Sequence, residues 1–416
     1  MRVIGCALVW ACLFLAARAE ELPQARPEDV GLSADKLARV SAIVQNAVAK
    51  HQTAGVVVLV ARRGKAVYHE GFGKLDLQAG QAMPTDAIFR IHSMSKPITS
   101  AAALILSEQG KLGLDDPVSK YLPEFQGLRV YAGAGAETVT ARRAMTIRDL
   151  LRHTSGLTYG MPNGSPVDKL YIANKIEDPS DSLADLTRKL GTLPLQYQPG
   201  TRFQYSVSTD VLGRIIEVAS GKALDVFLKE QVFQPLDMRD TGFLVGDAQA
   251  NRLAASYRVA GNGKLQVIDA PATSRYRKPR KYLSGGGGLV STARDYARFC
   301  QMLVNGGELQ GTRLLSSESV QAMTTNQLPA DALPMTLGGF SQTGLSFGFG
   351  VSVKLATAQR RSDRTAGEYG WSGAASTYFW VAPKAELIVI VLQQAQPFNF
   401  GLEMALKPAV YAAITD

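Results

Sequence analysis

The most informative segment of the chain is Ile91-His92-Ser93-Met94-Ser95-Lys96-Pro97, which leads directly into Ala101-Ala102-Ala103-Leu104-Ile105-Leu106. The second part is apolar on nearly every side, which predicts a buried helix that stops at Gly110. Ser93 is expected in the first turn of this helix, where backbone N–H groups have no intrahelical partner and the helix dipole is positive. Such surroundings favour an oxyanion beside the serine.

Lys96 follows Ser93 by three residues, so it lies on the same helix face one turn away, and its amine can reach the hydroxyl. A lysine in a desolvated pocket has its charged form disfavoured and can accept a proton. The spacing alone is ambiguous, because Ser33-Ala34-Asp35-Lys36 shares it in a helix with a charged face. On the tetrad alone, a nucleophile with its base and a capped helix with a snorkelling lysine are equally good interpretations.

Three further segments sharpen the interpretation. The segment from Ile91 to Pro97 resembles the nucleophile motif of the serine β-lactamase and penicillin-binding-protein superfamily. Three more segments resemble other signatures of that superfamily: Leu150-Leu151-Arg152-His153-Thr154-Ser155-Gly156-Leu157, Leu283-Ser284-Gly285-Gly286-Gly287-Gly288-Leu289 and Trp371-Ser372-Gly373-Ala374-Ala375-Ser376-Thr377-Tyr378. The matches occur in the superfamily's order over about residues 28–395. The branch that the chain resembles most is the family VIII carboxylesterases, which are similar in fold to class C β-lactamases.

The resemblance implies partners for Ser93. Tyr205-Ser206-Val207 stands in the place of the superfamily's tyrosine motif, so Tyr205 would share a proton with Lys96 and act as general base. A free phenol has a pKa near 10 and is a poor base, but a cationic Lys96 beside it would stabilise the phenolate. The alternative is a half-buried core aromatic. Ala374 and Ser93 would supply the backbone N–H groups of the oxyanion hole.

Two departures from the lactamase pattern point to esters. Val207 stands where the lactamases have asparagine, and Trp371 stands where they have the lysine of Lys-Thr-Gly. A substrate pocket formed by Val207, Trp371, Ser372 and Gly373 would lack the cationic and amide donors that hold a substrate carboxylate. We expect it to favour neutral, apolar acyl groups.

A competing nucleophile is Ser346, in the G-x-S-x-G match Gly344-Leu345-Ser346-Phe347-Gly348. That motif requires a buried strand before the serine, a helix after it, and an acid and a histidine downstream. The last histidine of the chain is His153, so no histidine base follows Ser346. We therefore expect Ser346 not to act as nucleophile.

The hydrophobic pattern predicts an α/β (α+β) fold in which both ends of the chain build one antiparallel sheet. Hairpins are expected at 56–72 around Arg63-Gly64 and at 377–393 around Pro383-Lys384. Helices are expected at 34–50, 146–153, 182–190, 209–220, 223–232, 293–305 and 402–414. Residues 20–416 are thus predicted to form a single domain, with a sheet region at about 28–90 and 340–416 and a mostly helical region at about 91–339.

The first 19 residues resemble a signal peptide. Arg2 precedes the apolar run Val3–Leu15, and Ala17-Arg18-Ala19 has the small-x-small form of a cleavage site. The run is too short to span a bilayer, so we expect export with no stable membrane anchor, to the periplasm or beyond. Cleavage would remove two of the three cysteines and leave Cys300, which we expect to be a buried hydrophobe.

Composition excludes several classes of protein. A chain of 416 residues with 46% hydrophobic and 19% charged residues is an ordinary folded protein, neither disordered nor collagen-like. Its net charge of +9 is mostly dispersed, which favours solubility over nucleic-acid binding. No metal-ligand spacing and no phosphate loop is present in the sequence, so no metal or cofactor is expected. The one dense basic cluster is interpreted as a solvated loop, with an anion-attracting rim as the alternative: Arg275, Arg277, Lys278, Arg280 and Lys281.

The sequence therefore predicts an exported serine hydrolase, a carboxylesterase for short-chain or compact acyl esters that works through a Ser93 acyl-enzyme. A β-lactamase or D-alanyl-D-alanine carboxypeptidase is the alternative within the same superfamily, so a β-lactam remains a possible substrate. A non-catalytic binding protein is a further alternative. The oligomeric state is left open.

Overall fold

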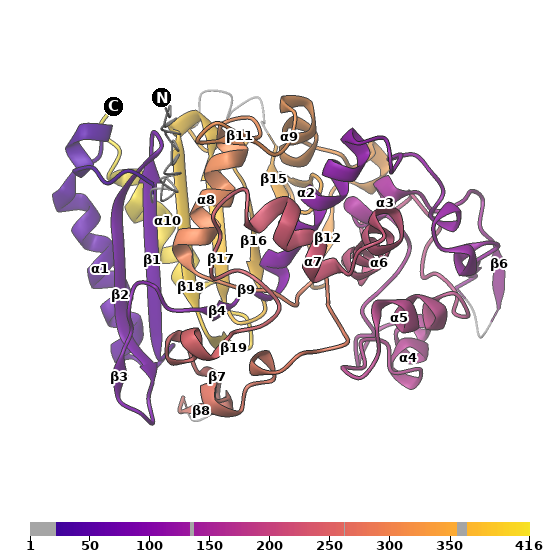
Figure 1. Ribbon diagram of the computed structural model, residues 1–416, viewed down its shortest axis with the longest axis horizontal. Coiled ribbons are helices and arrows are strands. Elements are labelled where there is room, and N and C mark those ends of the chain that lie inside the picture. The colour runs from indigo at the N-terminus through magenta and orange to yellow at the C-terminus, as the bar shows by residue number, and fades with distance from the viewer. Residues whose placement is uncertain (1–21, 134–136, 262, 356–363) are drawn as a thin grey trace, which may run out of the picture.

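The computed structural model describes residues 22–133, 137–261, 263–355 and 364–416. The predicted signal peptide, residues 1–19, lies outside this range. Within it, an antiparallel sheet of eight strands forms the frame, in the order β14-β15-β16-β17-β18-β1-β2-β3. Figure 1 shows the sheet on one side of the molecule and a group of helices on the other.

The two ends of the chain close the sheet, as predicted. Strand β1 (Gly55–Arg62) pairs with β18 (Leu387–Gln393) on one side and with β2 (Lys65–Asp76) on the other. The turn between β1 and β2 places Arg63 and Gly64 at φ of 51° and 74°, the left-handed pair that a tight hairpin requires. The remaining strands of the sheet are β3 (Gln81–Ala82), β14 (Leu345–Phe347), β15 (Ser352–Lys354), β16 (Tyr369–Gly373) and β17 (Thr377–Ala382).

Helices cover both faces of the sheet, so that every residue of β1 is buried. On one face lie α1 (Ala34–Ala49) and α10 (Gly401–Ala412), and on the other lies α8 (Ala293–Val304). Apolar residues of α1 recur every three or four positions and face the sheet, and Ser33 caps its first turn by accepting from the Lys36 N–H at 3.3 Å. Cys300 of α8 is fully buried, as predicted.

The middle of the chain carries the remaining helices. Their bounds are α2 (Ser95–Glu108), α3 (Ile147–Leu151), α4 (Pro166–Ala173), α5 (Leu183–Leu190), α6 (Ser208–Ser220), α7 (Leu224–Leu228) and α9 (Ser317–Thr324). Thr146 and Ser182, predicted as first helical residues, instead cap α3 and α5 in capping boxes with Asp149 and Asp185.

The middle region contains more strand than predicted. Short ribbons form where β-branched and aromatic residues alternate with polar ones, as in Ser256–Val259. The pairs are β4 (Phe89–Arg90) with β9 (Val290–Ser291), β5 (Arg129–Tyr131) with β6 (Thr138–Thr140), β10 (Glu308–Leu309) with β11 (Thr312–Arg313), and β12 (Thr336–Leu337) with β13 (Phe340–Ser341). A three-stranded ribbon joins β7 (Ser256–Val259), β8 (Leu265–Asp269) and β19 (Ala395–Gln396).

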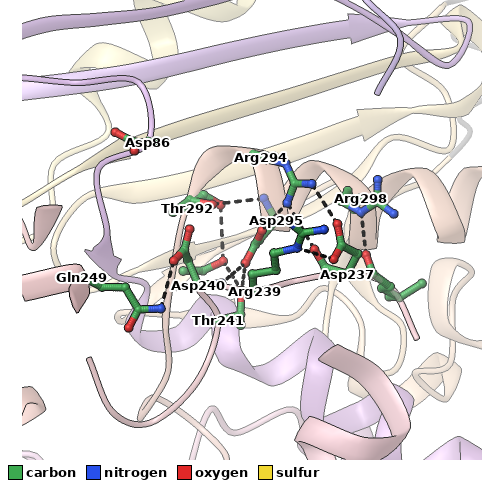
Figure 2. Close-up of polar contacts among 12 residues, drawn as sticks. Asp86, Asp237, Arg239, Asp240, Thr241, Gln249, Thr292, Arg294, Asp295 and Arg298 are labelled. Carbon is green, nitrogen blue, oxygen red and sulfur yellow. Dashed lines mark hydrogen bonds and ion pairs between the residues drawn. The ribbon is translucent and has the colours of Figure 1, made fainter. Parts of the chain in front are cut away.

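A buried ionic network fastens α8 to the loop at 237–241 (Figure 2). The carboxylate of Asp295 accepts from the Asp240 N–H at 2.7 Å, from Thr241 Oγ1 at 3.0 Å and from Arg294 Nη1 at 3.1 Å. Arg294 also pairs with Asp237 at 2.9 Å. Burial raises the pKa of Asp295 to about 6.

The basic cluster at 275–281 is partly structural. Arg280 stacks over the ring of Tyr276 at 4.2 Å and donates to the carbonyls of Phe243 and Gly288, and Arg277 pairs with Asp247.

In the described residues, no helix is long and apolar enough to cross a membrane. The same part of the chain holds no group of three or more metal-ligating side chains.

Candidate active site

Ser93 lies where the chain turns from the ribbon strand β4 into α2. It sits in a 3₁₀ turn, His92–Met94, immediately before α2 begins at Ser95, rather than inside the first turn of the helix as predicted. His92 has a φ of 45°, which is uncommon for a residue with a side chain and recurs at functional sites. This turn presents Ser93 at the surface of a cavity.

Lys96 is fully buried and points at Ser93. Its Nζ donates to Ser93 Oγ at 3.3 Å, to Tyr159 OH at 2.9 Å and to the carbonyl of Gly286 at 2.7 Å. Three acceptors match the three hydrogens of an ammonium group. The structure thus brings together the side chains of Ser93 and Lys96. In the competing tetrad, by contrast, Ser33 Oγ accepts from the backbone N–H of Lys36 as a helix cap.

The ring of Tyr205 also contacts the ammonium. The Lys96 Nζ sits 4.6 Å from the centre of the Tyr205 ring, within the range of a cation–π contact. The Tyr205 hydroxyl accepts a hydrogen bond from Trp371 Nε1 at 3.1 Å. The predicted trio of Ser93, Lys96 and Tyr205 is therefore assembled, with the indole of Trp371 fixing the phenol.

Tyr159 is a site residue that the sequence analysis missed. Its hydroxyl touches Lys96 directly, its ring centre is 5.3 Å from that of Tyr205, and it lines the cavity. Burial, helped by nearby Tyr205, Asp210 and Glu177, raises the pKa of Tyr159 well above its ordinary value. The sequence signal was its position two residues after the segment 150–157, which was among the matching motifs.

The end of β16 approaches the Ser93 turn very closely. A Cβ atom on Gly373 would lie 2.3 Å from the Ile91 carbonyl oxygen, so only glycine permits this approach. Ala374 follows directly, and Ser93, Ser372, Gly373 and Ala374 all line the same cavity. The end of β16 that leads to Ala374 therefore lies beside the turn that carries Ser93.

The cavity has a volume of about 1100 Å³. Its lining includes the aromatic and apolar side chains of Tyr205, Trp371, Met161, Phe203, Met335 and Phe340, together with charged residues, among them Arg202, Lys354 and Lys407. Val207 is fully buried in the core and, contrary to the prediction of a pocket residue, is not among the residues that line the cavity. The backbone turns into α6 there and directs the side chain inward.

A model of the family described as Beta-lactamase matches residues 40–410, nearly the whole chain. The chain belongs to the β-lactamase family. Protein Rv1367c of Mycobacterium tuberculosis is 38% identical over 353 residues, which cover 82% of this chain and 86% of that protein. Esterase EstB of Burkholderia gladioli is 32% identical over 401 residues, covering 91% and 96%.

The solved structures agree with this family. The structure of "EstCE1, a hydrolase with promiscuous acyltransferase activity" superimposes with a TM-score of 0.77 at 29% identity, covering 90% of this chain and 98% of that one. The predicted superfamily and fold class are confirmed. The combination of a large antiparallel sheet with a helical region is the frame on which this β-lactamase-family protein holds Ser93.

Ser346 lies apart from this constellation. It is fully buried on the edge strand β14, its hydroxyl donates to Asn326 Oδ1, and the chain continues into β15 rather than into a helix.

His153 packs on Tyr205 at 4.8 Å and on Phe347 at 5.4 Å. Its burial and the positive charge of Lys96 hold the pKa of His153 well below its usual range, so the ring is neutral.

Proposed function

We propose that this protein is a serine carboxylesterase that hydrolyses esters with short or compact acyl groups through a Ser93 acyl-enzyme. The observation that carries the proposal is the contact of Lys96 with Ser93 Oγ in a cavity lined by Trp371, which stands where the lactamase pattern has a lysine. Membership of the β-lactamase family and the likeness to Esterase EstB support a serine hydrolase acting on carboxylic esters.

In the proposed reaction, Ser93 Oγ attacks the ester carbonyl carbon while its proton passes to the Tyr205 phenolate, which the Lys96 ammonium stabilises. The backbone N–H groups of Ser93 and Ala374 hold the oxyanion, and the proton then goes to the departing alcohol. Water attacks the acyl-enzyme and releases the carboxylic acid. Tyr159 stays neutral because burial raises its pKa, and its hydroxyl positions the ammonium by accepting from Lys96 Nζ.

The size of the cavity favours a second activity at the same acyl-enzyme. A volume of about 1100 Å³ leaves room for an alcohol beside a compact acyl group. The structurally similar EstCE1 is described as a hydrolase with promiscuous acyltransferase activity, which supports the same proposal for this chain. Transfer to an alcohol would replace water in the last step. Adding 1-butanol to a hydrolysis assay and measuring butyl ester tests this activity.

The nucleophile is tested by comparing Ser93→Ala with Ser346→Ala on p-nitrophenyl butyrate. We expect Ser93→Ala to lose at least about 10³-fold in kcat/KM and to form no adduct with a phosphonate ester, and Ser346→Ala to keep both. A phosphonate adduct that mass spectrometry maps to Ser346, or no adduct on wild type, would refute the assignment. Nitrocefin turnover above ester turnover would instead favour a β-lactamase.

We also propose export. The support is the basic, apolar and small-x-small order of residues 1–19. Expression of the full chain should yield a product that begins near Glu20 in the periplasmic fraction or the medium, read by N-terminal sequencing. A cytoplasmic product with an intact N-terminus would contradict it.

A further inference from the structure

The ammonium of Lys96 is fully buried, yet its three hydrogen-bond partners are all uncharged. A buried cation without a negative charge nearby is costly, so the protein must compensate it. Asp210 is a fully buried carboxylate in the first turn of α6. Lys96 and Asp210 interact electrostatically, and the lysine opposes the rise that burial imposes on the pKa of Asp210.

Asp210 also holds the segment that touches Lys96. Its Oδ1 accepts from Ser284 Oγ at 2.5 Å and from the Gly286 N–H at 3.2 Å. The carbonyl of the same Gly286 accepts from Lys96 Nζ at 2.7 Å. Gly286 therefore bridges the Asp210 carboxylate, through its N–H, and the Lys96 ammonium, through its carbonyl.

The bridge depends on close packing. A Cβ on Gly286 would lie 2.6 Å from Asp210 Oδ2, and a Cβ on Gly285 would lie 2.7 Å from the carbonyl oxygen of Thr209. Thr99 of α2 adds a tether by donating to the Gly285 carbonyl at 2.7 Å. The run of glycines thus allows a backbone segment to be clamped between α2 and α6.

We propose that Asp210 is a positioning residue for Lys96, which aims the Gly286 carbonyl at the ammonium and supplies the negative charge that keeps the ammonium form in place. Nothing in the resemblance of the motifs assigns a role to this carboxylate. The inference rests on the proposed function, because it takes Lys96 as the partner of Ser93.

The other titratable groups around this centre do not replace Asp210. Tyr159 and Tyr282 are held neutral because burial raises the pKa of each well above its ordinary value. Burial and the charge of Asp210 raise the pKa of Glu177 to about 8, so Glu177 keeps its proton at neutral pH. Tyr205 presents its ring face to Lys96. Asp210 is the carboxylate whose ionised form Lys96 and the donors Ser284 and Gly286 favour, against the rise in its pKa that burial imposes.

The sign of the expected pH effect follows from this charge. An anion beside Lys96 favours its protonated form, so removing the anion lets the Lys96–Tyr205 pair release its proton at lower pH. The acid limb of kcat/KM against pH should then move downward in Asp210→Asn. A nearby unit charge shifts a titration by about 1 to 3 units, and we expect a shift of at least about 1 unit.

The test is the pH profile of p-nitrophenyl butyrate hydrolysis by the full chain. Asp210→Asn keeps an oxygen that can accept from Ser284 and Gly286 but carries no charge. We expect its acid limb to move down by about 1 unit and its kcat to fall about 10-fold with little change in KM. Asp210→Ser also removes the charge, with a smaller side chain, and should shift the acid limb by the same amount. It replaces Asp210→Asn in the test if the asparagine variant does not fold.

Two controls separate charge from structure. Ser284→Ala loses one bond of the clamp but no charge, so it should lower kcat without moving the acid limb. Asp225→Asn removes an exposed carboxylate of α7 and should change neither. An acid limb within about 0.2 units of wild type in folded Asp210 variants would overturn the proposal. If Ser93→Ala also retained activity, the proposed function itself would fail, which is a separate outcome.

Discussion

The contact between Gly373 and the Ile91 carbonyl offers a direct test of the active-site geometry. Gly373 does not adopt a positive φ, so its backbone conformation suits any residue and the requirement for glycine is one of space. In Gly373→Ala the new Cβ would lie 2.3 Å from the Ile91 oxygen and 2.4 Å from Thr377 Oγ1. The threonine can rotate away, but the carbonyl belongs to the backbone that leads to Ser93.

The size of the effect follows from these distances. A Cβ needs at least 3.0 Å from such an oxygen, so β16 and the Ser93 turn must separate by at least about 0.7 Å. A misplacement near 1 Å typically costs about 10²-fold in rate, and loss of one oxyanion donor costs about 10²- to 10³-fold, or about 2.7–4 kcal/mol. Overpacking should also lower the free energy of unfolding by about 1–3 kcal/mol.

The assay is kcat/KM for p-nitrophenyl butyrate at a temperature well below the melting transition, with thermal unfolding measured in parallel. Gly242→Ala is the matched control, because a Cβ there meets nothing within 4 Å and its φ is also ordinary. We expect the control to behave as wild type and Gly373→Ala to lose about 10²- to 10³-fold. If Gly373→Ala folds and keeps kcat/KM within threefold of wild type, the inferred oxyanion hole is wrong.

Three further outcomes are expected. Tyr205→Phe should lower kcat by about 10²- to 10⁴-fold as loss of a general base, and Tyr159→Phe by only about 10-fold, measured by steady-state kinetics; equal losses would reject the division of roles. Ser346→Ala should keep kcat/KM but unfold about 1 kcal/mol more easily in urea, because Asn326 loses a donor. The raised pKa of Asp295, about 6, means that its contribution to stability is full below about pH 4 and is lost as pH rises through 6. In urea titrations, the free energy of unfolding of Asp295→Asn should therefore rise relative to that of wild type by about 2–3 kcal/mol between pH 4 and 7. A difference in the free energy of unfolding that stays constant with pH would contradict this.

The features that the sequence predicted well are local. The Ser93–Lys96 pair depends on spacing within one helical turn, and the Arg63-Gly64 hairpin on two adjacent residues that tolerate positive φ. The pairing of the chain ends follows because two apolar hairpins need a common sheet, here through Val58 opposite Val391. In each case the determining interaction lies within a few residues, or is set by the hydrophobic pattern.

The features that it missed depend on tertiary contacts. Tyr159 meets Lys96 across 63 residues of sequence, and its place depends on how the loop after α3 folds over α2. Val207 was assigned to the pocket from its position in a motif, but the turn into α6 directs that side chain into the core. Asp210 is an acidic residue near the start of a helix, which in sequence resembles ordinary complementation of the helix dipole. Its burial against the glycine segment is visible only once the two segments pack together.

Trp371 connects the chemistry of this site with its substrate preference. Its indole takes the place where the lactamase pattern has a lysine, so the cavity lacks a cation for a substrate carboxylate at that point. The same indole N–H donates to the Tyr205 hydroxyl and would stabilise negative charge on that oxygen. A single side chain thus removes a determinant for anionic substrates and orients the proposed base. Because the two effects share one residue, a substitution at position 371 should alter both the substrate pocket and the hydrogen bond that orients the proposed base.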